Sequence, residues 1–373
     1  MKPARRIGEL RPSPIRLLSE GASPEAMPLG LGEPSWELPA AARRALAASR
    51  GACGYGPNAG LPDLRRAIAE RHGVREEAVL VTAGAEGALY SLFQAWLDPG
   101  DQVLVPDPGY PAYRALARLA EAEAVPYALD AAHGWRLDAV AFERALEAHP
   151  AARVAVLNHP SNPTGGGASR EALAAVARVC EVRGILLVSD EVYRELHFGQ
   201  AVPSLRELSP SGVVLESVSK GWAAPGLRVG WAVGDPRWLA PARTVHAFAV
   251  TAAPEPCQRA ALALLEDAPS ILEASRRELA CRWEALDEAC RHHLGACPSR
   301  PDGSFYHWMP LPAGAGEDPL AFCVRLRDEA GVVLVPGFTF GEAGRRHLRL
   351  SFGATPGQVA EGVRRLAPFW RMA

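Results

Sequence analysis

Residues 217–230 read Ser-Val-Ser-Lys-Gly-Trp-Ala-Ala-Pro-Gly-Leu-Arg-Val-Gly and follow the apolar run 213–215. The apolar run favours a buried strand, so Lys220 stands at a strand end where desolvation lowers the pKa of an amine. A neutral amine can form a Schiff base with a carbonyl cofactor, and Ser217, Ser219 and Arg228 could bind the phosphate of that cofactor. A strand that ends in a polar turn with a solvated lysine is the alternative, and this run alone leaves it open.

The composition is that of an ordinary globular chain of 373 residues, with 48% hydrophobic residues and a formal net charge of −2. This length is enough for more than one domain, and the charge argues against nucleic acid as a partner. Seven cysteines, an odd number without a CxxC pair, predict free thiols in a reducing compartment. We expect a cytoplasmic protein without a membrane segment, because no apolar run reaches ~18 residues and the basic N-terminus lacks the apolar segment of a secretory signal.

Short β-branched runs alternate with helical patterns from about residue 40 onward. Several runs are apolar on both faces, as in buried parallel strands, and most are separated by enough residues for a crossover helix. This pattern predicts an α/β domain over residues 40–275 with a mostly parallel sheet flanked by helices. The expected strands are 78–82, 102–106, 153–158, 185–189, 213–217 and 228–233.

The two ends of the chain predict other structure. Residues 1–39 are rich in Pro and Gly and favour an extended N-terminal arm that joins a small domain. A long amphipathic helix at 269–293 leads out of the large domain. The rest predicts a smaller α+β domain over 276–373, with strands at 304–309, 332–336 and 347–352 and helices at 318–330 and from 356 onward.

Small and aromatic residues follow the first two expected strands, at the edge where ligands bind in such sheets. Gly84, Ala85 and Glu86 open a helical pattern after strand 78–82. Small residues there leave free backbone N–H groups at the positive end of a helix dipole, which suits a phosphate. Tyr110 follows strand 102–106 in a proline-rich turn, which presents a flat ring that can stack on a pyridine.

Two further strand ends supply an amide and a carboxylate. Asn162 lies in the run Asn-His-Pro-Ser-Asn-Pro-Thr-Gly, residues 158–165, in which we interpret His159 as structural. Asp190 ends strand 185–189, where a buried carboxylate needs a partner such as a pyridinium nitrogen. Tyr193, three residues later, could reach the phenolic oxygen of the same ring. A helix-capping role for Asp190 is the alternative.

These motifs, in this order from Gly32 to Phe352, resemble the fold-type I aminotransferases of class I/II, the aspartate aminotransferase superfamily. The resemblance implies a seven-stranded sheet in the large domain and pyridoxal 5′-phosphate (PLP) as cofactor, held by Lys220 as an aldimine. It implies no metal. The cofactor-binding residues that it implies are Gly84, Ala85, Glu86, Tyr110, Asn162, Asp190, Tyr193, Ser217, Ser219, Lys220, Arg228 and Tyr55.

The resemblance also assigns residues to the substrate and to assembly. Gly32 and Asn162 contact the substrate, and Arg349, in the run 347–352, binds its α-carboxylate. The alternation of this run places Leu348 and Leu350 on one face and Arg349 on the other. Tyr55 reaches the phosphate in the neighbouring subunit, which implies a homodimer with shared active sites.

The sequence therefore predicts a PLP-dependent aminotransferase that moves an amino group from an amino acid to a 2-oxo acid by a ping-pong mechanism. Lys220, Asp190 and Tyr193 are its expected catalytic residues. A PLP-dependent β-lyase or cyclase is the alternative on this scaffold, whereas Lys220 and Asp190 argue against a non-catalytic effector-binding module. The identities of donor and acceptor stay open. Candidates for the specificity pocket are Ile15, Trp36, Trp222 and Phe338.

Overall fold

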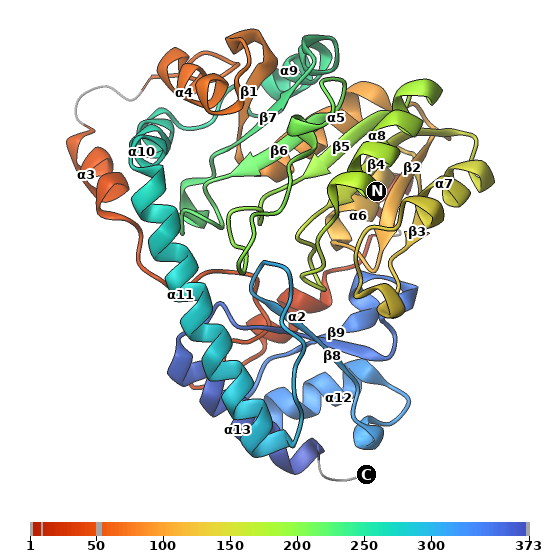
Figure 1. The fold of residues 1–373 in the computed structure, drawn as a ribbon, viewed down its shortest axis with the longest axis vertical. Coiled ribbons are helices and arrows are strands. Elements are labelled where there is room, and N and C mark those ends of the chain that lie inside the picture. The colour runs from red at the N-terminus through yellow and green to blue at the C-terminus, as the bar shows by residue number, and fades with distance from the viewer. Residues whose placement is uncertain (1–2, 9, 50–53, 371–373) are drawn as a thin grey trace.

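The computed structural model describes residues 3–8, 10–49 and 54–370. A seven-stranded sheet and a three-stranded sheet lie at opposite ends of the molecule, and helix α11 (Ala268–Ala289) runs along one side from the first to the second (Figure 1). None of the described helices is both long and apolar enough to cross a membrane. Cys53, one of the expected free thiols, lies outside the described residues.

The large sheet has the strand order β1-β7-β6-β5-β4-β2-β3. Its strands β2 to β6 pair in parallel, whereas β7 is antiparallel to both of its neighbours, β1 and β6. The predicted mostly parallel sheet is therefore confirmed, with β3 as the strand that the sequence pattern missed. The strands are β1 (Val79–Thr82), β2 (Gln102–Asp107), β3 (Glu123–Ala128), β4 (Ala152–Asn158), β5 (Leu186–Asp190), β6 (Val213–Ser217) and β7 (Gly230–Gly234).

Helices cover both faces of this sheet, so its strands are buried on both sides (Figure 1). Val103 and Val105 of β2 pack in one core cluster with α5, α6 and α9, while Leu104 packs in another with α7 and α8. A third cluster joins β1 and β7 to α3, α4 and α10. These helices are α3 (Ala40–Ala48), α4 (Pro62–His72), α5 (Gly84–Trp96), α6 (Pro111–Leu119), α7 (Ala139–Ala148), α8 (Arg170–Arg183), α9 (Pro236–Val250) and α10 (Glu255–Glu266).

The expected strand 228–233 is corrected by the structure, since β7 begins only at Gly230. Arg228 lies in a turn before the strand and has a left-handed backbone conformation, with φ +54°. This turn reverses the chain after β6, so that β7 returns beside it in the antiparallel direction.

The small sheet has the order β8-β10-β9, with β8 (Tyr306–Pro310), β9 (Val335–Pro336) and β10 (His347–Ser351). Helices α12 (Pro319–Arg325) and α13 (Pro356–Trp370) contribute to the core around it. The N-terminal arm joins this unit, because Leu29 is buried in its core and its carbonyl accepts a hydrogen bond from the backbone of Ser351. The arm is not wholly extended, since it contains helices α1 (Arg5–Gly8) and α2 (Pro14–Glu20). The domain boundary at residue 275 falls inside α11 and stays a prediction.

Candidate active site

Four of the predicted site residues lie just beyond strand ends on the same edge of the large sheet. Asp190 is the last residue of β5, Asn162 and Lys220 follow β4 and β6, and Gly84 follows β1. Parallel strands present their carboxyl ends at one edge, so loops that are far apart in the sequence meet there. The small unit completes the site from the other side, through Arg349 of β10.

Lys220 is a half-buried side chain without a carboxylate partner within ion-pair distance among the described residues. Its Nζ donates to the carbonyl of Gly32 at 2.5 Å and lies 5.6 Å from the ring centre of Tyr193. Burial, reinforced by the positive charges of Arg349 and Arg228, lowers the pKa of Lys220 to about 8. A substantial fraction of this amine is therefore neutral, and nucleophilic, near physiological pH.

Lys220 is also one of only two lysines in the whole sequence, the other being Lys2. The remaining 38 of the 40 cationic Lys and Arg side chains are arginines, which do not form Schiff bases in this way. Lys2 lies outside the described residues. Carbonyl chemistry in the described part of the chain therefore has a single amine side chain to act on.

Asp190 is a buried carboxylate held by its neighbours. The hydroxyl of Tyr113 donates to its Oδ2 at 2.7 Å, and the backbone N–H of Val192 points to its Oδ1. Burial raises the pKa of Asp190 to about 6, against the opposing effects of the Tyr113 hydrogen bond and the Lys220 charge. Tyr113, which was not among the residues predicted for the site, is thus a direct neighbour of Asp190 that sequence reasoning missed.

Asn158 joins the loop that carries Asn162 to the strand that carries Asp190. Its Nδ2 donates to the carbonyl of Asp190 at 3.0 Å, and its Oδ1 accepts the backbone N–H of Asn162 at 2.7 Å. One buried amide therefore fixes the spacing between these two site residues. The neighbouring His159 is buried, and its Nε2 lies 2.9 Å from the hydroxyl of Ser189. Burial lowers the pKa of His159 to about 3, so the ring is neutral, in keeping with a structural role.

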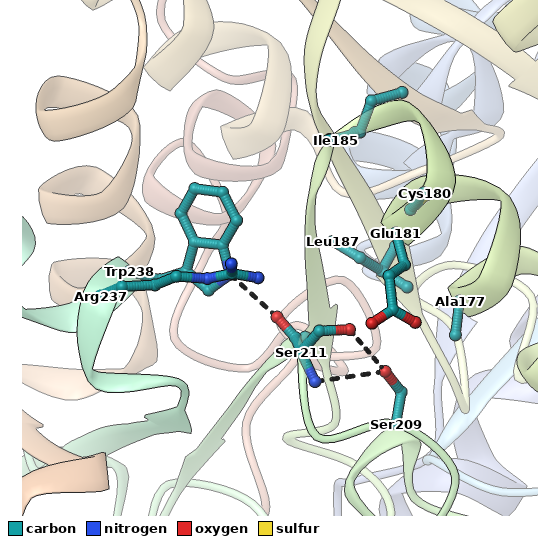
Figure 2. A pocket seen from close by; sticks show the side chains of 11 residues that line it. Ala177, Cys180, Glu181, Ile185, Leu187, Ser209, Ser211, Arg237 and Trp238 are labelled. Atoms are coloured by element: carbon teal, nitrogen blue, oxygen red, sulfur yellow. Dashed lines mark hydrogen bonds between the residues drawn. The ribbon is translucent and has the colours of Figure 1, made fainter.

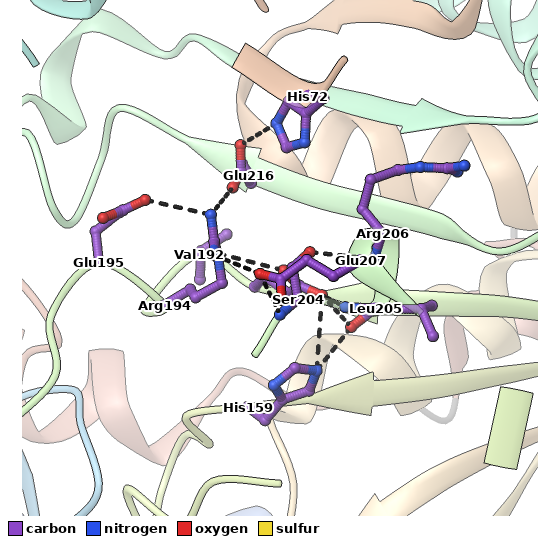
Figure 3. A network of polar contacts seen from close by, with 12 residues as sticks. His72, His159, Val192, Arg194, Glu195, Ser204, Leu205, Arg206, Glu207 and Glu216 are labelled. Carbon is purple, nitrogen blue, oxygen red and sulfur yellow. Dashed lines mark hydrogen bonds and ion pairs between the residues drawn. The ribbon is translucent and has the colours of Figure 1, made fainter. Parts of the chain in front are cut away.

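A buried ionic network supports the turn that carries Asp190 and Tyr193 (Figure 3). Arg194 lies between several carboxylates at 3.4 to 3.7 Å, and one of them, Glu216, also accepts hydrogen bonds from the indole of Trp231 and the ring of His72. Ion pairs of Arg194 therefore hold the turn that follows Asp190 in place. The carboxylates around Arg194 belong to Glu191, Glu195, Glu207 and Glu216.

Arg349 is a buried cation, with 1% of its surface exposed. Its Nη1 donates to Oδ1 of Asn162 at 2.8 Å and its Nη2 to the carbonyl of Gly30 at 2.6 Å. The guanidinium carbon lies 4.4 Å from the ring centre of Tyr306 and 4.8 Å from that of Phe340. Its Nε has no hydrogen-bond partner, and no described carboxylate lies within ion-pair distance. A buried guanidinium with a spare donor and no counter-charge is suited to a carboxylate ligand.

The start of α5 forms a compact anion cradle with the segment after β6. Gly84 has φ +77°, and a Cβ there would lie 2.6 Å from Nη2 of Arg228. A Cβ on Gly230 would lie 2.4 Å from the backbone nitrogen of Ala85, so both glycines are needed for this close approach. The hydroxyls of Ser217 and Ser219 hydrogen-bond each other at 2.7 Å beside the same turn.

Glu86 puts a negative charge at this cradle. It is exposed in the first turn of α5, and its charge contributes to the raised pKa values of Tyr110 and Asp190. The backbone of Gly84 to Glu86 suits an anion, whereas the Glu86 carboxylate opposes one. Tyr110 packs edge to face against Tyr113, with 5.7 Å between ring centres.

The specificity candidates fall into two groups. Ile15 packs beside Trp308 and Phe340, Trp36 packs edge to face on Phe305, and Phe338 is partly exposed. Trp222, in contrast, is 2% exposed and packs against Trp231 in the core of the large unit. The structure therefore places this candidate in the core cluster that joins β1 and β7 to α3, α4 and α10, a different cluster from those of Trp36 and Ile15.

One cavity lies away from this cluster, and another borders it at Tyr306. The smaller, about 20 Å³, lies at the amino ends of β5 and β6, where the indole of Trp238 donates to the carbonyl of Ser211 (Figure 2). It has room for a water molecule but not for a cofactor. The larger, about 490 Å³, is lined in part by Tyr306, Trp308 and Trp135.

Comparison with known proteins agrees with this geometry. Residues 24–366 match the family model described as aminotransferase class I and II. An arginine–pyruvate transaminase from Pseudomonas aeruginosa is 35% identical over 92% of this chain and 89% of its own. The structure of aspartate aminotransferase from Thermus thermophilus with maleate superposes with a TM-score of 0.90, at 31% identity and 99% coverage of both chains. An aminotransferase from Mycobacterium tuberculosis gives 0.91, at 28% identity and full coverage of both. The chain therefore belongs to the class I and II aminotransferases, enzymes that transfer amino groups from amino acids and that generally depend on PLP.

Proposed function

We propose that this aminotransferase uses PLP bound to Lys220 and transfers amino groups between α-amino acids and 2-oxo acids in two half-reactions. The observation that carries the proposal is the environment of Lys220, a half-buried lysine whose amine has a lowered pKa near the buried carboxylate of Asp190 and the buried guanidinium of Arg349. A structural lysine gains nothing from this position, because burial without a counter-charge destabilises its ammonium form.

The residues around Lys220 match the chemical groups of PLP. The cradle offers hydroxyls, backbone N–H groups and a guanidinium to a phosphate, Asp190 offers an acceptor to a pyridinium, and Tyr110 offers a ring face. Arg349 supplies the unpaired cation for a substrate carboxylate. The proposed cofactor-binding residues are Gly84, Ala85, Glu86, Tyr110, Asn162, Asp190, Tyr193, Ser217, Ser219 and Arg228.

When bound, PLP supplies an aldehyde carbon and a ring that withdraws electrons from the substrate's α-carbon. Once the substrate amine had displaced it from the aldehyde carbon, the free Nζ of Lys220 would take the α-proton as general base and return a proton as general acid, since a pKa of about 8 allows both states. The carboxylate of Asp190 would accept a hydrogen bond from the protonated ring nitrogen, and the hydroxyl of Tyr193 would donate to the phenolic oxygen. Arg349 fixes the α-carboxylate and thereby aligns the C–H bond that Lys220 attacks.

Reductive trapping tests the central assignment. We expect sodium borohydride to fix PLP on the peptide that contains Lys220, and mass spectrometry to find no adduct in Lys220→Arg. Because the sequence has only one other lysine, the adduct has a single competing side chain. Wild-type protein that carries the adduct on Lys2, or none at all, would refute the assignment.

An amino-donor panel then tests the transfer itself. The relatives named above act on arginine or aspartate, so the panel should include basic, acidic, apolar and aromatic amino acids. Addition of a true donor should convert the visible band of bound PLP to the ultraviolet band of its aminated form, and a 2-oxo acid should reverse it. Stoichiometric ammonia without reversal would instead identify a lyase.

We also propose a homodimer in which Tyr55 reaches the partner's cradle. Tyr55 is 92% exposed and lies outside the cluster of its own chain, and Phe248 is 91% exposed. Asn58 Nδ2 donates to the carbonyl of Thr251, which brings these two segments together. Sedimentation should give twice the monomer mass, and Tyr55→Phe should weaken PLP binding. A monomer with undiminished PLP affinity would contradict the proposal.

A further inference from the structure

Tyr306, on the edge strand β8, contacts three separate segments of the site. Its hydroxyl lies 2.7 Å from the hydroxyl of Tyr193, and its ring faces the guanidinium of Arg349 at 4.4 Å. The same hydroxyl packs against the backbone of Gly32, where an added Cβ would lie 2.0 Å from it. Gly32 in turn accepts the hydrogen bond of Lys220. One buried side chain of the small unit therefore contacts Tyr193, Arg349 and the Gly32 backbone to which Lys220 donates.

The two hydroxyls share one hydrogen bond, so their donor and acceptor roles are linked. Burial raises the pKa of both Tyr193 and Tyr306, and both phenols are protonated at neutral pH. If Tyr193 directs its proton to a ligand, its oxygen can still accept the proton of Tyr306. A hydroxyl that accepts one hydrogen bond becomes a stronger donor of the next.

We propose that Tyr306 is a positioning residue that acts through Tyr193 with its hydroxyl and through Arg349 with its ring. The proposal rests on the proposed function and deepens it, since it assigns to one residue the coupling between the cofactor's phenolic oxygen and the carboxylate clamp. The hydroxyl donates to Tyr193 and strengthens the hydrogen bond that Tyr193 makes. The ring, at the edge of the small sheet, and the ring of Phe340 both contact the guanidinium of Arg349 and hold it in place.

The two parts of the side chain can be separated by substitution. Tyr306→Phe removes the hydroxyl and keeps the ring over Arg349, whereas Tyr306→Leu removes both. Tyr127→Phe is a matched control, because Tyr127 is also buried and its hydroxyl donates to a backbone carbonyl, that of Val156, away from the site.

The main readout is a pH titration of the visible absorbance of bound PLP, which does not depend on turnover. A weaker hydrogen bond from Tyr193 would leave more negative charge on the phenolic oxygen. This charge favours the protonated form of the nitrogen that joins PLP to Lys220. Tyr306→Phe should therefore raise the absorbance pKa by roughly half a unit to one unit, and Tyr127→Phe should leave it unchanged. In steady state, the Phe variant should lower kcat with KM for the donor within about twofold, and the Leu variant should also raise KM by about tenfold or more.

A double-mutant cycle decides whether Tyr306 acts through Tyr193. Tyr306→Phe should shift the absorbance pKa in the wild-type background and have no further effect in Tyr193→Phe. An equal shift in both backgrounds, or none in either, would overturn the inference. Wild-type protein that forms no visible band with PLP would overturn the proposed function itself, and the inference with it. Failure of the Leu variant to fold leaves the cycle with the Phe variants intact.

Discussion

Replacement of Arg349 by methionine should reduce kcat/KM by roughly two to four powers of ten. Arg349 is buried, so water does not screen its interaction with a bound carboxylate, and Asn162 and Gly30 already hold its fork in place. Loss of one partner from a buried ion pair costs about 3–5 kcal/mol, and each ~1.4 kcal/mol is a tenfold effect. Methionine keeps the length of the side chain and its packing between Tyr306 and Phe340, so the loss should report the charge.

The assay compares single-turnover kcat/KM for an amino-acid donor and for the corresponding amine that lacks the α-carboxylate. The donor should lose the full factor, and the amine should lose less than about threefold, because it has nothing for Arg349 to bind. Arg282→Met is the control, since Arg282 is also buried, with 3% of its surface exposed, but lies in α11, over the ring of Trp36. Equal losses for donor and amine would refute the assignment and show that Arg349 acts only on the structure of the site.

Three further predictions follow from charges at and behind the site. The rate at which PLP binds Lys220 should rise with pH and level off above about pH 8, because the pKa of Lys220 is lowered to about 8. A rate, measured by stopped flow, that climbs steadily to pH 10 would contradict this. Glu86→Gln should tighten PLP binding about three- to tenfold, because it removes a negative charge beside the cradle. Glu77→Gln, at an exposed position before β1, should leave PLP affinity unchanged. Titration of PLP fluorescence measures both affinities. Glu216→Gln should lower the free energy of unfolding by about 3 kcal/mol, seen as a lower urea midpoint, since it unpairs a buried charge cluster. The pKa of Glu216 is lowered to about 2, so the wild type should lose this stabilisation as the pH falls from about 4.5 towards 2, and a midpoint that is flat over this window would count against it.

The sequence pattern predicted the sheet through strands that are apolar on both faces, and it failed where that signal is absent. The edge strand β3 alternates exposed and buried residues and contains Pro126, which an edge strand tolerates but which breaks the pattern of a central one. The direction of β7 was also hidden, because a buried antiparallel strand is as apolar as a parallel one. The turn through Arg228 reverses the chain there, and an arginine in the sequence gives no sign of its left-handed conformation.

Site residues were predictable where they follow strands within one motif, as Asp190 and Asn162 do. Tyr113 and Tyr306 were not, because each joins the candidate site through a hydrogen-bond partner that lies 77 or 113 residues away in the chain. Trp222 shows the limit of closeness in the sequence. It lies two residues after Lys220, yet its large ring is buried in the core of the large unit.

The scarcity of lysine has a practical consequence for the handling of this protein. Reagents that target primary amines, such as succinimidyl esters or aldehyde surfaces, meet only two lysine side chains in this sequence, Lys2 and the half-buried Lys220. Arginine guanidinium groups stay protonated and do not react with them under mild conditions. A dye or a solid support can therefore be attached near the N-terminus, and an occupied Lys220 would be protected, so that a single labelling reaction distinguishes loaded from unloaded molecules.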